Sequence, residues 1–127
     1  MNGPRDGHSR RRAHRFGLSA EWVAAIWLMA RGYRLIDRRF TIRGGELDLV
    51  MWRRDTVAFV EVKARERMDD ALTSIDETKR RRIGKAARVW LARNPWAAQH
   101  TLRGDAVFLA PWRLPRHMVE AYTLDLD

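Results

Sequence analysis

Two short runs of the sequence place charged side chains inside segments that otherwise strongly favour β-strands. The runs are Gly45-Glu46-Leu47-Asp48-Leu49-Val50 and Phe59-Val60-Glu61-Val62-Lys63. Because side chains alternate along a strand, Glu46 and Asp48 share one face of the first run, and Glu61 and Lys63 share one face of the second. Charged groups in buried strands need partners, so these four side chains are candidates for a common site.

The turn between the two runs sets which of these side chains meet. An even-numbered turn at Arg54-Asp55 pairs residues whose numbers sum to 109, so that Asp48 faces Glu61 and Glu46 faces Lys63. A three-residue loop would turn the charged faces against each other, so this register rests on an even loop. Directly opposed residues of an antiparallel pair have Cβ atoms about 4.5–5.5 Å apart. The two carboxylates are therefore expected to lie close enough to repel.

That repulsion is relieved either by protonation of one carboxyl group or by a divalent cation, and oxygen-only ligands suit Mg²⁺ or Mn²⁺. Lys63 would then lie beside the metal, where its ammonium group could orient an attacking water or stabilise a charged transition state. This combination suits phosphodiester hydrolysis. The alternative is a cross-strand ion cluster of Glu46, Asp48, Glu61 and Lys63 that only stabilises the hairpin, since ion networks also perturb pKa values.

The elements that must position these residues follow from periodicity, capping and breaker residues. A mostly apolar helix is expected between Ser19, its N-cap, and Gly32, and a second helix opens with a capping box of Ser74 and Glu77 and ends near Asn94. Strands are expected at residues 33–41, 46–52, 57–64, 102–110 and, more weakly, 117–123. Because a strand, a long helix and another strand favour a right-handed crossover, the third and fourth strands should pair in parallel. The predicted fold class is α/β, an αβββαβ core with a mixed central sheet flanked by helices.

The chain is short and basic, with 127 residues, 25 Lys plus Arg and 16 Asp plus Glu. These values predict one domain, residues 17–127, preceded by a mobile basic arm, residues 1–16, with five arginines and one aspartate. The chain has no cysteine, which excludes disulfides, thiolate zinc sites and cysteine nucleophiles.

The sequence predicts no membrane span, because the longest apolar run, residues 22–30, is far shorter than the roughly 20 residues needed. Arg10, Arg11 and Arg12 before an apolar stretch suggest a twin-arginine export signal, but Glu21 interrupts the stretch and no cleavage site follows. A cytoplasmic location is therefore favoured.

The excess positive charge lies in the arm and in the second helix, where residues 76–93 hold seven basic and two acidic side chains. Within this helix Arg81, Lys85 and Arg88 recur at helical spacing and form a basic stripe that could follow phosphates. Solvated surface charge is the plainer reading of such a stripe. Because an acidic metal site needs a basic surround to approach phosphate, the combination favours DNA as the partner.

The same residues carry a resemblance that covers roughly residues 17–110. The runs Gly-Glu-Leu-Asp-Leu-Val and Phe-Val-Glu-Val-Lys-Ala-Arg, after an Ala20-Glu21 helix and Gly32-Tyr33, resemble the YraN-like family. That family is placed in the PD-(D/E)-x-K, restriction-endonuclease-like nuclease superfamily, related by fold to archaeal Holliday-junction resolvases. The resemblance implies a nuclease-like domain that acts on branched or structured DNA, and by analogy a symmetric homodimer.

The resemblance also implies a role for individual residues. Asp48 would be the motif aspartate, Glu61 and Lys63 the E-x-K pair, and Val62 a metal ligand through its backbone carbonyl. Glu21 would be the helical glutamate that assists catalysis, although an acid in a first helical turn is also stabilised by the helix dipole alone. Arg65 and Lys79 are further candidates for nucleic-acid contacts, and Arg103 and Asp105 are expected to form an ion pair that anchors the fourth strand. The rival function is a non-catalytic nucleic-acid-binding module whose carboxylates serve only stability.

Overall fold

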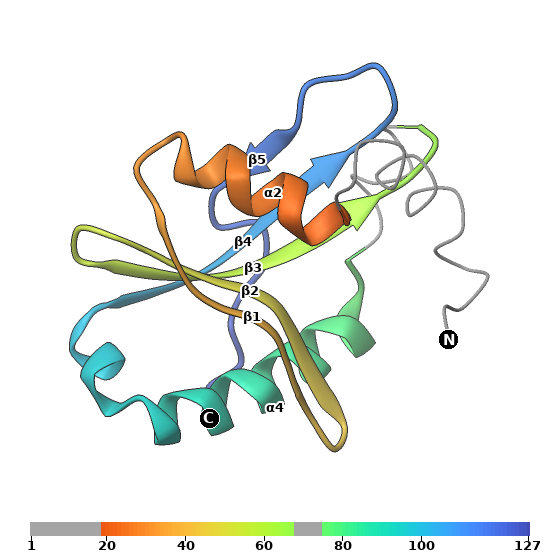
Figure 1. The fold of residues 1–127 in the computed structure, drawn as a ribbon. Coiled ribbons are helices and arrows are strands. Elements are labelled where there is room, and N and C mark those ends of the chain that lie inside the picture. Colours follow the sequence, from red (N-terminus) through yellow and green to blue (C-terminus); the bar gives the residue numbers. More distant parts are fainter. Residues whose placement is uncertain (1–18, 68–74) are drawn as a thin grey trace.

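A computed structural model describes residues 19–67 and 75–127, so the predicted arm, residues 1–16, and Ser74 lie outside the described residues. One five-stranded sheet has helix α2 on one face and helix α4 on the other (Figure 1). The elements, in chain order, are α2 (Ala20–Met29), β1 (Arg34–Ile42), β2 (Gly45–Arg53), β3 (Thr56–Ala64), α4 (Glu77–Arg93), the 3₁₀ helix η2 (Pro95–Gln99), β4 (Thr101–Leu109) and β5 (Arg116–Met118).

The sheet has the strand order β1-β2-β3-β4-β5, and only the β3–β4 pair is parallel. The chain leaves β3, passes through α4 and returns as β4, which is the crossover that the sequence predicts. In the parallel pair Lys63 lies beside Phe108 and Ala64 beside Leu109. The predicted α/β class, the αβββαβ order and the mixed pairing are confirmed.

Helix α2 begins where Ser19 accepts a hydrogen bond from the Trp22 backbone N–H, at 3.3 Å. The helix ends two residues earlier than predicted, at Met29, and Gly32 follows with φ +93°. The backbone N–H of Tyr33 donates to the carbonyl of Leu28, and this hydrogen bond caps the C-terminal end of the helix. Neither described helix is long and apolar enough to cross a bilayer.

Helix α4 has Asp76 as its N-cap, which accepts a hydrogen bond from the Lys79 backbone N–H at 2.9 Å. The predicted capping box needs Ser74, outside the described residues, and Asp76 takes its place directly before Glu77. Gly84 in the middle of the helix has a packing reason, because a Cβ there would lie 2.5 Å from the backbone oxygen of Asp125. The C-terminal segment thus crosses α4 in direct backbone contact.

The last predicted strand, residues 117–123, is wrong in extent, since β5 spans only Arg116–Met118. Glu120 has φ +54° and its backbone N–H donates to the Asp105 carboxylate at 3.1 Å, which removes it from any strand ladder. Tyr122 then packs over Gly104, where a Cβ would lie 2.7 Å from the tyrosine ring. Side-chain contacts with β4 therefore end the strand early.

Two hydrophobic clusters fix the helices on the sheet. On one face Ala24, Ala25 and Leu28 of α2 pack against Leu49 and Met51 of β2. On the other face Ile83, Ala87 and Trp90 of α4 pack against Leu47, Val50 and Phe59, and the C-terminal residues Tyr122, Leu124 and Leu126 join them. Trp90 is 1% exposed and donates its indole N–H to Asp37, so β1 is tied to α4 by a partly buried hydrogen bond.

Candidate functional site: a carboxylate and lysine cluster

The predicted register of β2 and β3 is confirmed, and its ladder ends where the charged residues begin. The paired residues run from Arg53–Thr56 to Leu49–Val60, and the numbers of each pair sum to 109. Beyond that pair Leu47 packs on the α4 side, whereas Leu49, of the same parity, packs on the α2 side. Strand β2 therefore turns its face between these residues, at Asp48.

Asp48 replaces the missing ladder bond at this turn. Its Oδ2 accepts a hydrogen bond of 2.8 Å from the backbone N–H of Val62, which holds the aspartate side chain against β3 between Glu61 and Lys63. The Asp48 carboxyl group also contacts that of Glu61 closely enough for each charge to act on the other. The two carboxyl groups thus converge, as the sequence predicts, although they do so at a break in the ladder.

Glu61 is the centre of the charge cluster and is 2% exposed. Its Oε2 lies 3.2 Å from Nζ of Lys63 and 3.2 Å from Nζ of Lys79, which comes from the first turn of α4. The Lys79 ammonium also lies 3.8 Å from Oε2 of Glu46. Glu46 is therefore partnered by Lys79, and the expected pairing of Glu46 with Lys63 is not among the described ion pairs or ladder pairs.

Burial raises the pKa of Asp48 well above its ordinary value, and repulsion from the Glu61 carboxylate raises it further. The Val62 N–H opposes this shift, and the charge of Glu21 adds to it. An isolated anion at Asp48 is therefore unfavourable, and either a proton or a cation would relieve it.

The two lysines respond to the same surroundings in opposite directions. Burial lowers the pKa of Lys63, with added repulsion from Lys79, and attraction to Glu61 offsets only part of this. Burial also disfavours the charged form of Lys79, but its attraction to Glu61 is large enough to raise its pKa. Lys79 is thus the firm counter-ion, and Lys63 is the ammonium that gives up its proton more readily.

Glu21 lies in the first turn of α2. This helix covers the face of the sheet opposite to α4, which carries Lys79. Glu21 acts on Asp48 electrostatically, and its Oε1 accepts a 3.5 Å hydrogen bond from Arg39. Arg39 has φ +57°, an uncommon backbone conformation for a residue other than glycine. The predicted proximity of Glu21 to the cluster is thus present, with Arg39 as a partner that the sequence pattern does not indicate.

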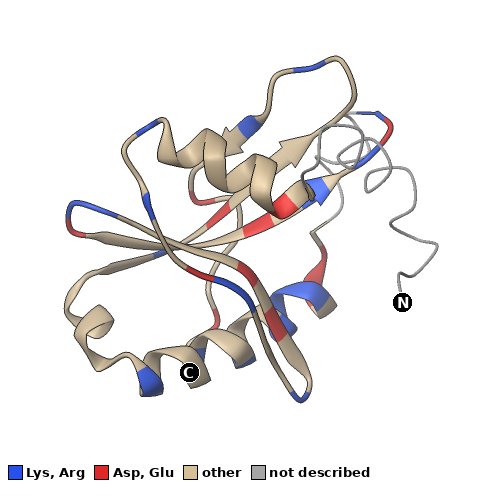
Figure 2. Cartoon of the chain, in the orientation of Figure 1, with Lys and Arg blue, Asp and Glu red and all other residues tan. Residues whose placement is uncertain are grey.

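The remaining residues predicted to contact nucleic acid separate into two groups. Arg65, Arg81 and Lys85 are exposed, with Arg81 in a 4.0 Å surface pair with Glu77. Arg88 instead donates to the backbone oxygen of Asp125 at 2.7 Å and so binds the C-terminal segment to α4. Figure 2 shows the basic N-terminal half of α4 on the same side of the molecule as the acidic positions of β2 and β3.

The side chains of the cluster determine whether it can hold a divalent cation. Residues 19–67 and 75–127 contain no group of three or more acidic, histidine or cysteine side chains arranged to hold a metal. The two carboxyl groups of Asp48 and Glu61 do converge, and the raised pKa of Asp48 is the electrostatic condition that a cation relieves. The donor chemistry thus fits Mg²⁺ or Mn²⁺ through these two residues, while the Lys63 and Lys79 ammonium groups neutralise Glu61.

The sequence pattern misses two contacts in this neighbourhood. Lys79 is predicted to contact nucleic acid, but its 3.2 Å ion pair with Glu61 is not predicted; it forms because the crossover returns the start of α4 to the end of β3. Tyr122 makes the second; its hydroxyl donates to the carbonyl of Phe59 at 2.6 Å, and burial raises its pKa, with added repulsion from Glu61. The capping pattern near residue 76 could have indicated Lys79, but no signal in the sequence indicates Tyr122.

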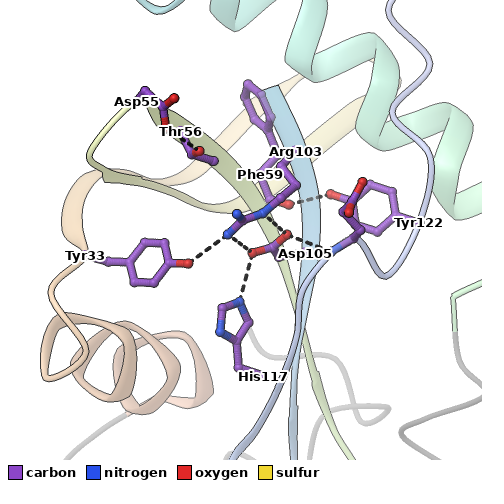
Figure 3. Close-up of polar contacts among 9 residues, drawn as sticks. Tyr33, Asp55, Thr56, Phe59, Arg103, Asp105, His117 and Tyr122 are labelled. Atoms are coloured by element: carbon purple, nitrogen blue, oxygen red, sulfur yellow. Dashed lines mark hydrogen bonds and ion pairs between the residues drawn. The ribbon is translucent and has the colours of Figure 1, made fainter. Parts of the chain in front are cut away.

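A second charge cluster lies on β4, where Arg103 and Asp105 form the predicted ion pair. Asp105 is 0% exposed, and its carboxylate accepts two 2.9 Å hydrogen bonds from Arg103 and a 2.8 Å bond from His117 Nε2 (Figure 3). Burial alone would raise the pKa of Asp105, but these hydrogen bonds and that of the Glu120 N–H more than offset it and lower the pKa. Arg103 also donates to the Tyr33 hydroxyl at 2.8 Å, which ties the start of β1 to β4.

Comparisons with known proteins place this arrangement among similar sequences. The model of the uncharacterised protein family UPF0102 matches residues 20–109, which include every member of the carboxylate and lysine cluster. A UPF0102 protein of Methylorubrum extorquens is 55% identical over 98% of both chains. A UPF0102 protein of Methylocella silvestris is 54% identical over 95% of this chain and 98% of its own, and one of Rhodopseudomonas palustris is 50% identical over 87% and 86%.

Proposed function

The chain belongs to the UPF0102 family, and from this premise we propose that it is a Mg²⁺- or Mn²⁺-dependent endonuclease that hydrolyses phosphodiester bonds in branched or structured DNA. The observation that carries the proposal is the convergence of Asp48 and Glu61 at the break in the β2–β3 ladder, with Lys63 beside them. Glu61 pairs with both ammonium groups of the cluster, whereas Asp48 has no ion pair among the described residues and its charge is unfavourable when no cation is bound.

In this proposal Asp48 and Glu61 hold the cation, and the Val62 carbonyl completes the protein ligands. When bound, the cation would polarise a phosphoryl oxygen and make a water a better nucleophile. The hydrogen bond from the Val62 N–H fixes the Asp48 carboxyl group before substrate arrives, so that no reorganisation is needed at that residue.

In this proposal Lys63 transfers a proton or stabilises the charge of the transition state. Its Nζ lies 3.2 Å from Glu61 and 9% of its side chain is exposed, so it can reach a phosphate or a water at the rim of the site. Because burial lowers its pKa, Lys63 exchanges a proton more readily than an exposed lysine. Lys79 is a close counter-ion of Glu61, with its Nζ 3.2 Å from Oε2, and Glu21 adds negative charge on the α2 side.

The basic residues of α4 and the residue after β3 supply the approach for DNA. Arg65, Arg81 and Lys85 are exposed around an acidic centre, and each phosphate contact strengthens binding through release of counterions. A cytoplasmic location remains a prediction from the sequence, and a symmetric homodimer that pairs two such sites remains a prediction from the resemblance to junction resolvases.

One observation favours a second candidate, a DNA-binding module without catalysis. Glu61 already has two ammonium groups at 3.2 Å, so its charge is neutralised without a metal. In that case Asp48 would be protonated, and the cluster would serve only to fix α4 against β3.

Cleavage of four-way junction, flap and linear duplex DNA in Mg²⁺, Mn²⁺ or EDTA separates the two functions. We expect metal-dependent cleavage by the wild-type chain and none by Lys63→Ala. Lys85→Ala, which removes the same charge from the exposed stripe, should weaken DNA binding and retain cleavage at saturating protein. Salt-sensitive DNA binding with no cleavage of any substrate would support the binding module instead.

A further inference from the structure

A cleft of about 310 Å³ lies apart from the carboxylate and lysine cluster and shares no residue with it. It opens between the end of α2, the end of β2 and the entry to β5. Its walls include Trp27, Arg31, Tyr33, Arg53, His117 and Val119. Cavities that hold small ligands start at about 300 Å³, so this cleft has room for one nucleotide-sized molecule.

Two guanidinium groups give the cleft its charge. Arg31 lies 4.8 Å above the ring centroid of Trp27, and Arg53 lies 4.7 Å above that of Tyr33. Arg53 also donates to the backbone oxygen of Arg31 at 3.1 Å, which links the two arginines. Within residues 19–67 and 75–127, neither arginine forms an ion pair with an acidic side chain. Each guanidinium has five N–H donors, so most remain available to an anion.

The aromatic wall of the cleft holds a hydrogen-bond donor without an acceptor. The indole N–H of Trp27 is out of contact with solvent and has no hydrogen-bond partner in the described part of the chain. A buried donor that lacks an acceptor costs free energy. The Arg31 guanidinium covers the Trp27 ring, so an anion held by Arg31 would also lie near this ring.

The buried Asp105 network orients His117, which lines the cleft (Figure 3). Because the Asp105 carboxylate is ionised and only accepts hydrogen bonds, His117 Nε2 must donate to it, over 2.8 Å. The His117 ring also meets the edge of Tyr33, with centroids 5.7 Å apart and planes at 83°. His117 therefore presents a fixed ring to the cleft, and Nδ1 is its remaining hydrogen-bonding atom.

From this combination we propose that the cleft binds a nucleoside phosphate. Arg31 and Arg53 hold the phosphate oxygens, since planar guanidinium groups suit phosphate. The base lies against the ring of His117 and the apolar side chain of Val119. The nucleoside phosphate is either a free mononucleotide or the 5′-terminal nucleotide of a DNA strand. The inference uses no residue of the proposed hydrolytic site and stands if that proposal fails.

Titration calorimetry in phosphate-free buffer, with chemical shifts of the indole N–H resonances, tests the assignment. The probes are deoxyadenosine 5′-monophosphate, deoxyadenosine, inorganic phosphate, and a 12-nucleotide single strand with and without a 5′-phosphate. We expect saturable binding of the monophosphate, with a shift of the Trp27 indole resonance. Binding of the unphosphorylated nucleoside should be at least about tenfold weaker, because a charged hydrogen bond is lost.

The variant Arg53→Gln should weaken binding of the monophosphate by about tenfold or more, and Arg53→Lys should restore part of the affinity. Arg93→Gln is the matched control, because Arg93 is an exposed arginine stacked 5.5 Å over Phe40 outside the cleft. The control should bind as the wild type does. Amide spectra of each variant show whether it is folded, so a misfolded variant cannot imitate a loss of binding.

The probes distinguish the sources of the ligand. Tight binding of the mononucleotide supports a free nucleotide, whereas preference for the 5′-phosphorylated strand over both the mononucleotide and the unphosphorylated strand supports a DNA end. Inorganic phosphate that binds as tightly as the mononucleotide would overturn the nucleoside assignment. Failure of every probe to bind the folded wild type, or equal losses in Arg53→Gln and Arg93→Gln, would overturn the site itself.

Discussion

The substitution Glu61→Gln removes the carboxylate that, within residues 19–67 and 75–127, forms ion pairs with both lysines of the cluster. Glu61 is 2% exposed, and Lys63 and Lys79 each place Nζ 3.2 Å from its Oε2. The glutamine keeps the size of the side chain, so the loss is electrostatic, and two neighbouring ammonium groups remain. Removal of one partner from a buried ion pair costs about 3–5 kcal/mol. For a domain of this size that cost lowers the melting temperature by about 10–20 °C at pH 7.

Between pH 7 and pH 10.5 the stability of the same variant should rise more steeply with pH than that of the wild type. Burial lowers the pKa of Lys63 below 10.5 even with Glu61 present, and attraction to Glu61 raises that of Lys79 above 10.5. Without Glu61 both pKa values fall, so the folded variant gains stability as pH rises toward 10.5 and the lysines lose their charge. In the wild type Lys63 gives a smaller gain of the same sign, because attraction to Glu61 offsets part of its shift, and the Lys79 contribution is lost only as pH rises from 10.5 through its raised folded pKa. The difference between the two should therefore shrink between pH 7 and pH 10.5.

Urea unfolding of both chains at several pH values in this range measures that difference. Glu77→Gln is the matched control, because Glu77 also lies near two basic side chains, Arg80 at 3.2 Å and Arg81 at 4.0 Å, but is 68% exposed. An exposed pair of this kind contributes at most about 1 kcal/mol. Equal losses in Glu61→Gln and Glu77→Gln, or a loss that does not change with pH, would refute the placement of Glu61 between two lysines.

Three further predictions concern the turn of β2 and the second charge cluster. In metal-free buffer Asp48→Asn should stabilise the fold near neutral pH, because the raised pKa of Asp48 makes its ionisation unfavourable above pH 3.8. Urea unfolding measures this gain in stability, which should disappear below pH 3.8. Gly45→Ala should cost about 1–3 kcal/mol in the same assay, since its Cβ would lie 2.6 Å from the backbone oxygen of Arg82 and force α4 away from the sheet. Asp105→Asn should destabilise the fold by about 3–5 kcal/mol at pH 7. The loss should be smaller below pH 3.8, because there the wild type also loses the stability that comes from the lowered pKa of Asp105. Thermal unfolding across pH 2–7 measures the loss at each pH.

Much of this site could be predicted because strand alternation and hairpin register are local properties. A two-residue turn at Arg54-Asp55 fixes the pairs that sum to 109 as far as Leu49–Val60, and this register brings the next residues, Asp48 and Glu61, close together. The break of the ladder at Asp48 could not be predicted in this way. It depends on Leu47 turning to the α4 face, which is a tertiary contact and leaves no periodic signal.

The contacts that the sequence pattern misses all join segments far apart in the chain. Lys79 meets Glu61 because of the crossover, Arg88 meets the Asp125 backbone because the C-terminal segment crosses α4, and Glu120 leaves its strand for Asp105. In each case a charged or polar group contacts a buried side chain or a backbone atom instead of solvent. Residue type and spacing identify such groups as candidates, but the fold decides which partner each one finds.

Titration of Mn²⁺ into the wild-type chain, followed by electron paramagnetic resonance of the free ion, tests the metal site most directly. The account predicts about one bound ion per chain, none in Asp48→Asn, and unchanged binding in Asp55→Asn, where the acid lies in the exposed β2–β3 turn. A folded wild-type chain that binds no Mn²⁺, or an Asp48→Asn variant that binds it as the wild type does, would contradict the assignment of Asp48 and Glu61 as metal ligands.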